Sequence, residues 1–234
     1  MTRYRYVKSH PVVVTVPIIP TTLIIFGCLI LAWVSWPILN QLVYAQTFGE
    51  IVTPIVENSE NQSIDKGEVA DVDYTKASNW FPNFPAKKTE SEITNYFLSI
   101  PKLGIVNATV IIGADDLSKS LIHYGGTGLP GKPGKAVIFG HSILPQFFDP
   151  QNYMSIFSLN YQLKEGDDIF IRFDGVDYRY KVTSRKITDP DDVSGLEQRF
   201  DDSYITLVTC FPSGTYLKRL WLTAKLAPFG KISK

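Results

Sequence analysis

YITLVTCFPSGTYLKRLWLTAKL, residues 204–226, contains two β-type runs joined by a short connection. The first run ends on Cys210, and the second carries Arg219 near its middle. A connection of this length predicts an antiparallel pair of strands. If the connection is FPSGTY (residues 211–216), its even length puts both side chains on one face of the sheet. We therefore expect Arg219 to be a diagonal neighbour of Cys210 and to reach its thiol.

Similar short β-type runs, separated by turn residues, fill the chain from residue 96 onward. Besides the two above, they are YFLSIPKL, VNATVIIG, KAVIFGH, DDIFIRFDG and VDYRYKVTSRKI. The last two alternate on either side of Asp174 and Gly175, which predicts a hairpin. Short helical pieces are expected only at residues 114–123 and 152–159. This pattern predicts an all-β barrel or sandwich.

The N-terminal part has a different character, since no residue from Pro11 to Gly49 is charged at neutral pH. A helix of about 20 apolar residues crosses roughly 30 Å of hydrocarbon, so residues 11–45 are long enough for a membrane anchor. Basic residues Arg3, Arg5 and Lys8 precede this run. They predict a single-pass protein of the cell membrane with a cytoplasmic N-terminus and an extracytoplasmic remainder.

A cleaved signal peptide is the alternative, with Val43, Tyr44 and Ala45 at a small-residue cleavage site. The apolar run exceeds a typical signal h-region of about 7–15 residues, which favours the retained anchor. Four segments are then expected: a cytoplasmic N-terminus (1–10), the anchor (11–45), a polar extracytoplasmic linker (46–95) and the β domain (96–234). Within the linker, the apolar residues Trp80, Phe81 and Phe84 are expected to dock on the domain.

Cys210 is the only cysteine in the exported part, because Cys28 lies in the apolar segment. An unpaired thiol in an oxidising compartment is either a buried core residue or a reactive group. A reactive thiol needs a proton partner, and the exported part offers only His123 and His141. His141 follows a strand in FGHS, where a barrel rim delivers a side chain to a cleft, so we prefer it. His123 closes an expected short helix and reads as structural.

Other functional classes find little support in the sequence. The 23 basic and 23 acidic residues balance, which argues against nucleic acid as a partner. GGTGLPGKPGK (residues 125–135) resembles a P-loop, but Pro133 stands where Ser or Thr would bind magnesium, so we interpret it as a tight, exposed loop. The acidic clusters lack calcium-loop spacing, and one Cys with two His is too few for structural zinc. We expect no metal and no cofactor.

Taken together, TLVTC at residues 206–210, Arg219 in KRLWLTAKL and GHS at residues 140–142 resemble the sortase family. HYGGTGLPGKPGKAVIFGH (residues 123–141) resembles the segment that leads to the family's histidine, and IPKLGIVNATV (residues 100–110) resembles its opening strand pair. The resemblance covers about residues 96–227. It implies an eight-stranded β-barrel with short helices behind an N-terminal transmembrane helix.

The resemblance also implies a cysteine transpeptidase of the bacterial envelope. By motif position, Cys210 is the nucleophile, His141 the general acid and base, and Arg219 the ligand of substrate and oxyanion. Ser142, where the family often has Arg, and Thr209 are candidates for substrate contacts. Sortases cleave secreted proteins at an LPxTG-like sorting motif, hold the acyl group as a thioester and pass it to an amine of a peptidoglycan precursor or a pilin.

Two alternatives use the same residues differently. A membrane-tethered thiol peptidase would release its product to water, and a non-catalytic β-barrel that binds envelope ligands would keep the fold with an inert Cys210. Residues 46–95 contain no DP-aromatic lid motif, so a pilin-polymerising subclass has no support from the sequence.

Overall fold

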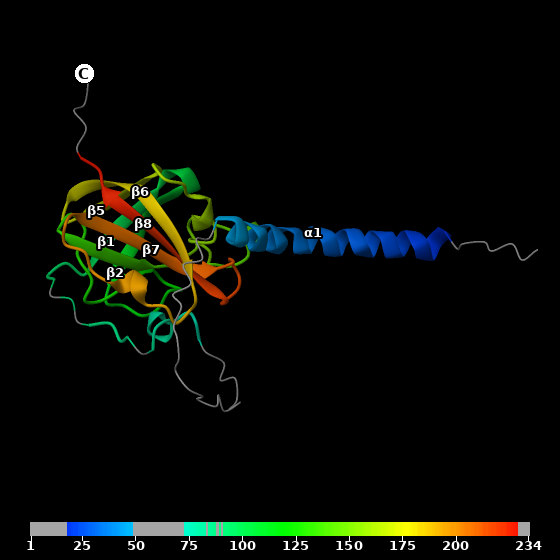
Figure 1. Ribbon diagram of the computed structural model, residues 1–234, viewed down its shortest axis with the longest axis horizontal. Coiled ribbons are helices and arrows are strands. Elements are labelled where there is room, and N and C mark those ends of the chain that lie inside the picture. The colour runs from blue at the N-terminus through cyan, green and yellow to red at the C-terminus, as the bar shows by residue number, and fades with distance from the viewer. Residues whose placement is uncertain (1–17, 49–72, 83, 88, 90, 229–234) are drawn as a thin grey trace, which may run out of the picture. The chain divides into compact units, whose positions relative to one another are not determined.

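The computed structural model describes residues 18–48, 73–82, 84–87, 89 and 91–228. Its helices are α1 (Ile18–Phe48) and the short 3-10 segments η1 (Ala77–Asn79), η2 (Pro101–Leu103), η3 (Pro145–Phe147), η4 (Asn160–Gln162) and η5 (Ser194–Leu196). Its strands are β1 (Asn95–Ile100), β2 (Ile105–Ile112), β3 (Leu121–His123), β4 (Gly134–Phe139), β5 (Asp168–Phe173), β6 (Val176–Thr188), β7 (Ser203–Phe211) and β8 (Lys218–Leu226) (Figure 1).

The chain divides into two compact units, residues 1–39 and 40–234, so most of α1 belongs to the first unit and the barrel to the second. Within the described residues, no helix meets the length and hydropathy required to cross a membrane. The transmembrane anchor predicted over residues 11–45 is therefore not confirmed. Its first seven residues, and residues 49–72 of the predicted linker, lie outside the described part of the chain.

The eight strands close into a barrel with the order β1-β2-β3-β4-β7-β8-β6-β5, which confirms the predicted all-β fold. Most neighbours are antiparallel, but β2 with β3 and β4 with β7 run parallel. The parallel pairing of β4 with β7 is important for function. It brings the segment that follows β4 to the same end of the barrel as the last residues of β7.

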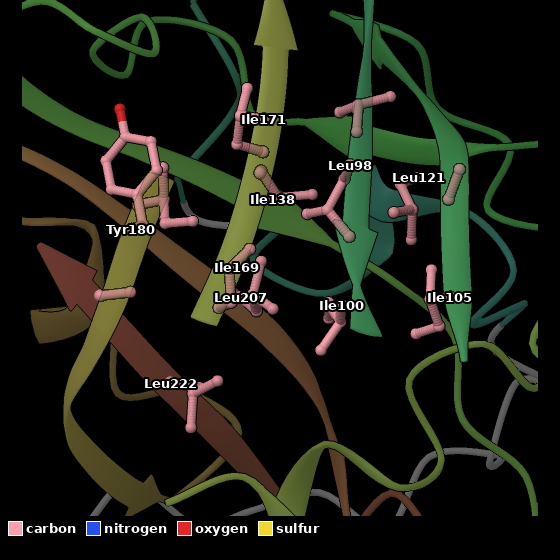
Figure 2. Close-up of a cluster of buried hydrophobic side chains, with 14 of the residues drawn as sticks. Leu98, Ile100, Ile105, Leu121, Ile138, Ile169, Ile171, Tyr180, Leu207 and Leu222 are labelled. Carbon is pink, nitrogen blue, oxygen red and sulfur yellow. The ribbon is translucent and has the colours of Figure 1, made fainter. Parts of the chain in front are cut away.

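The barrel interior is filled by one apolar cluster from alternate positions of the strands. Figure 2 shows its members pointing inward, among them Leu98, Ile138, Leu207 and Leu222. Because side chains of a strand alternate between the two faces, the intervening residues of β7 and β8 point outward. Cys210 is one of these outward residues.

The outward face of β7 is also buried, because a second apolar cluster covers it. Ala77, Trp80 and Phe81 from the N-terminal side pack there against Val208, Cys210 and Trp221. The backbone of Lys76 forms a bridge with Asp116 that fastens this segment. We call residues 73–82 the covering segment. The predicted docking of Trp80 and Phe81 is confirmed, whereas the prediction for Phe84 is wrong, since its side chain is 53% exposed.

Two local predictions were also wrong. Residues 114–123 do not form a helix: the chain makes turns up to Ser120, and Leu121–His123 form β3, whose partners are β2 and β4. The glycine-rich loop is tight, as predicted, but much of it is not exposed. A Cβ at Gly128 would lie 2.7 Å from the Lys135 nitrogen, so the loop folds closely onto the start of β4.

Candidate active site

Cys210 and Arg219 lie directly opposite each other on β7 and β8. Arg219 Nη1 is 3.6 Å from Cys210 Sγ. The shared face follows from the even length of the connection, as predicted. The predicted diagonal relationship was wrong, because Phe211 and Lys218 also pair and the connection therefore comprises residues 212–217.

The register of β4 against β7 brings His141 to the same place. Phe139 pairs with Val208, and the next amide, that of Gly140, donates to the Val208 carbonyl at 3.1 Å. Continuing this register by two residues puts His141 beside Cys210. The hydroxyl of Ser142 donates to the Cys210 carbonyl at 3.1 Å, which ties the two segments together. The fold thus gathers His141, in the segment after β4, with Cys210 on β7 and Arg219 on β8 in one row.

Thr209 and Ser142 are both buried, and their hydroxyls are occupied by backbone groups. Thr209 Oγ1 donates to the Gly140 carbonyl at 2.9 Å, and Ser142 Oγ donates to Cys210 as described. Each bond joins the chain around His141 to the chain around Cys210. These contacts hold the two segments in register, and the predicted contact of both residues with substrate stays a prediction.

Gly140 is required by packing, since a Cβ at this position would lie 2.3 Å from the ring of Phe157. Phe157 is fully buried in the barrel core, and its amide donates to the His141 carbonyl at 3.1 Å. The glycine therefore lets the segment around Phe157 approach the backbone of His141 closely.

The ring of His141 is held by the same segment. Its Nδ1 lies 3.1 Å from the carbonyl oxygen of Met154. A carbonyl can only accept, so Nδ1 carries the proton and Nε2 remains as the basic nitrogen of the neutral ring. The sequence could not show this contact, because the partner is a backbone atom.

His123 has a different environment. Its Nδ1 lies 2.9 Å from the hydroxyl of Tyr96, and its Nε2 lies 3.1 Å from Thr127 Oγ1. Thr127 donates its own proton to the Tyr124 carbonyl, so His123 Nε2–H donates to Thr127 and Nδ1 accepts from Tyr96. Burial lowers the pKa of His123 to about 4. Both nitrogens are occupied, which fits a structural histidine.

Aromatic side chains of the covering segment lie over Arg219. The guanidinium carbon is 5.1 Å from the ring centre of Trp80 and 5.7 Å from that of Tyr74. Tyr74 in turn stacks on Tyr216 of the β7–β8 connection, with ring centres 4.2 Å apart. Such cation–π contacts stabilise a guanidinium that has lost water. They leave Arg219 only 1% exposed.

The guanidinium is incompletely satisfied beneath this cover. Nη1 lies 3.4 Å from the carbonyl oxygens of Tyr216 and Lys218, which are long contacts. Within the described part of the chain, the buried Nε has no hydrogen-bond partner. An unused donor beside the thiol is suited to an oxygen that becomes negative during a reaction.

Burial keeps the two proton-transfer groups neutral. It raises the pKa of the Cys210 thiol to about 11, although the charge of Arg219 opposes the shift. Burial also lowers the pKa of His141, and the Met154 carbonyl, the backbone of Ser142 and the charge of Asp73 oppose that shift. With the covering segment in place, the resting pair is therefore a thiol and a neutral imidazole.

The described residues contain no group of three or more His, Cys, Asp or Glu that could hold a metal ion. The chemistry available at the row of His141, Cys210 and Arg219 is that of a thiol nucleophile, a base and a donor for an oxyanion. This combination is suited to cysteine-dependent acyl transfer.

Comparison with known proteins places the barrel in a family. The Sortase domain model matches residues 98–227. Sortase D of Bacillus subtilis (strain 168) is 28% identical over 129 residues, which are 53% of this chain and 58% of that protein. The chain thus spans less than two thirds of this curated relative.

Solved structures give the same result. The pilus-related sortase C of Group B Streptococcus is 30% identical with a TM-score of 0.51, over 60% of this chain and 70% of that one. Sortase A from Corynebacterium diphtheriae is 27% identical with a TM-score of 0.52, over 61% of this chain and 64% of that one. The chain belongs to the sortase family, whose members are cysteine transpeptidases.

Proposed function

We propose that this protein is a sortase-type transpeptidase that uses Cys210 as nucleophile, His141 as general acid and base, and Arg219 as ligand of the oxyanion. The single observation that carries the proposal is the contact between Arg219 Nη1 and Cys210 Sγ at 3.6 Å. The hydrogen bonds of Thr209 to Gly140 and of Ser142 to Cys210, on either side of His141, support His141 as the base.

The reaction proceeds in two acyl transfers. His141 Nε2 takes the proton of the thiol, and the sulfur forms a bond to the carbonyl carbon of the substrate amide. The C–N bond then breaks, His141 gives its proton to the leaving amine, and a thioester remains on Cys210. An incoming amine loses a proton to His141 and forms the new amide, the sulfur leaves as thiolate, and His141 returns the proton to it, which restores the thiol. Arg219 stabilises the negative oxygen of each tetrahedral intermediate.

The substrates are secreted proteins that carry an LPxTG-like sorting motif, which is cleaved between Thr and Gly. The acceptor is an amine of a peptidoglycan precursor or of a pilin. Both options are retained because the similar structures include a sortase A and a pilus-related sortase C.

We also propose that α1 attaches the enzyme to the cell membrane, with the N-terminus in the cytoplasm and the barrel outside. The support is that residues 18–48 contain no charged residue and that large apolar side chains such as Leu23, Phe26 and Trp33 are exposed on the helix. Arg3, Arg5 and Lys8 precede it. Alkaline extraction of membranes tests the proposal: the full chain stays in the membrane pellet, and release into the supernatant would contradict it.

The test of the enzymatic proposal is a product analysis. The full chain in detergent micelles is incubated with a panel of LPxTG-like peptides, with and without an amine acceptor such as triglycine, and the products are identified by mass. The expected product is the peptide up to Thr joined to the acceptor. Products ending in a free carboxylate at equal rates with and without acceptor would show a thiol peptidase instead.

A separate result would support the alternative that the barrel binds envelope ligands without catalysis. If no peptide is cleaved by the wild-type chain, and Cys210 also resists alkylation in the folded protein, the barrel is a binding domain and the enzymatic proposal fails.

A further inference from the structure

The turn that contains Met154 contacts the ring of His141, the proposed base. The Met154 carbonyl lies 3.1 Å from His141 Nδ1, and the backbone of Ser142, the next residue in the chain after His141, also interacts with the ring. In thiol and serine hydrolases, a base works because a third group fixes its tautomer and orientation. The peptide at Met154 occupies the position of such a third group.

A peptide group orients a ring only if the peptide itself is fixed. The amide of Met154 donates to Asn152 Oδ1 at 3.0 Å, which closes an Asx turn and fixes the peptide that precedes Met154. The amide of Ser155, on the other side, donates to the Asn152 carbonyl at 2.9 Å. Both peptides of Met154 are thus held by Asn152.

The turn is also fastened to the rest of the barrel on both sides of Met154. The hydroxyl of the preceding residue, Tyr153, accepts the amide of Thr109 in β2 at 2.9 Å. The following residue, Ser155, is fully buried, and its Oγ accepts the Asp149 amide at 2.9 Å. The turn is therefore a fixed part of the scaffold, whereas Asn152 itself is exposed.

We propose that Asn152 is a positioning residue of this enzyme: it fixes the Met154 carbonyl, which holds His141 with Nδ1 protonated and Nε2 free for the Cys210 thiol. The inference rests on the proposed function for its kinetic consequence. Its structural half, the tautomer of His141, stands independently of catalysis.

The closing experiment uses the full chain in detergent micelles and three variants. Asn152→Ala removes the acceptor for the Met154 amide. Asn152→Asp keeps an acceptor oxygen and serves as the conservative rescue. Gln151→Ala is the matched control, because Gln151 is the exposed neighbour and only its backbone amide takes part in a recorded bond.

The first readout is ¹⁵N NMR of labelled histidine, with the three histidines of the chain assigned by His141→Gln and His123→Gln difference spectra. His141 of the wild type and of Gln151→Ala is expected as the Nδ1–H tautomer, and Asn152→Ala is expected to give a mixture. The charged groups near the site are Asp73 of the covering segment, which acts on His141, and Arg219, which contacts the neutral Cys210 thiol. None of them is changed in these variants.

The second readout is kinetic. Asn152→Ala is expected to lower kcat about tenfold with KM unchanged, since orientation and not binding is lost. Asn152→Asp, measured at its own pH optimum, is expected to recover most of the loss. An Nε2–H tautomer in the wild type, or an unchanged tautomer and kcat in Asn152→Ala, would overturn the inference. If the wild type transfers no acyl group but shows the Nδ1–H tautomer that Asn152→Ala disturbs, the proposed function fails and the positioning role stands.

Discussion

Arg219 and Cys210 face each other across β7 and β8, with 3.6 Å between Nη1 and Sγ. The positive charge favours the thiolate, and burial disfavours it. The fold therefore keeps a nucleophile protonated next to the group that will stabilise its charge and that of the oxyanion. The predictions below follow from this relationship and from the groups that cover it.

Arg219→Lys is expected to lower kcat/KM by about a hundredfold, because an ammonium cannot reproduce the fixed fork of the guanidinium at an oxyanion. The measurement is the rate of acyl transfer to triglycine. Arg172→Gln is the control, since Arg172 forms an exposed ion pair with Asp177 on β5 and β6 and should leave the rate unchanged. Equal losses in both variants would show a general effect on the fold.

Trp80→Ala is expected to speed alkylation of Cys210 by iodoacetamide, because Trp80 packs in the cluster that leaves the cysteine only 3% exposed. The rate is followed by intact mass at fixed pH, with circular dichroism to verify folding. Phe84→Ala, which changes an exposed ring, is the control. An unchanged alkylation rate in folded Trp80→Ala would mean that other groups protect the thiol.

The covering segment shows which contacts could be predicted from the sequence and which could not. The apolar character of Trp80 and Phe81 sufficed to predict docking, because such side chains are rarely left in water. It could not indicate the docking position, since a cation–π contact with Arg219 depends on the barrel register and not on local pattern. Tyr74 gave no signal in a polar tract.

For the strands, too, the sequence predicted some features and missed others. Alternation and turn residues predicted the seven longer runs, and parity predicted the common face of Cys210 and Arg219. β3 was missed because Leu121–His123 is too short to show a period, and its pairing with β2 and β4 is set by tertiary contacts. The hydrogen bond from His141 to Met154 could not be predicted from the sequence, because every residue has a backbone carbonyl that could accept it.

The pH dependence of thiol reactivity follows from the raised pKa of Cys210. Alkylation of the wild type is expected to accelerate continuously with pH and to level off only near 11. The folded-state pKa lies above the usual thiol value, so folding stability from this group is complete below about pH 9 and is lost as pH rises from 9 to 11. A plateau near pH 8 would show that the thiol is not desolvated in solution.

His123 is expected to govern acid stability and not catalysis. Its pKa of about 4 is depressed by burial, so its contribution is complete above pH 6.5 and is lost as pH falls towards 4. The loss amounts to about 3 kcal/mol of unfolding free energy. Urea unfolding of His123→Gln should show a weaker dependence between these pH values.

The two histidines are also separated by activity. His123→Gln, where folded, is expected to keep most of the acyl-transfer rate, whereas His141→Gln loses at least about a hundredfold as a general acid and base would. Comparable losses in both variants would remove the reason for choosing His141.

The central claim, that Cys210 carries the acyl group, is tested most directly by intact-mass analysis of the full chain after rapid acid quench with an LPxTG-type peptide and no acceptor. The account predicts a covalent adduct with the mass of the peptide up to Thr, which maps to Cys210, is released by hydroxylamine and is missing from Cys210→Ala. Turnover of the peptide without any adduct, or an adduct that persists in Cys210→Ala, would contradict it.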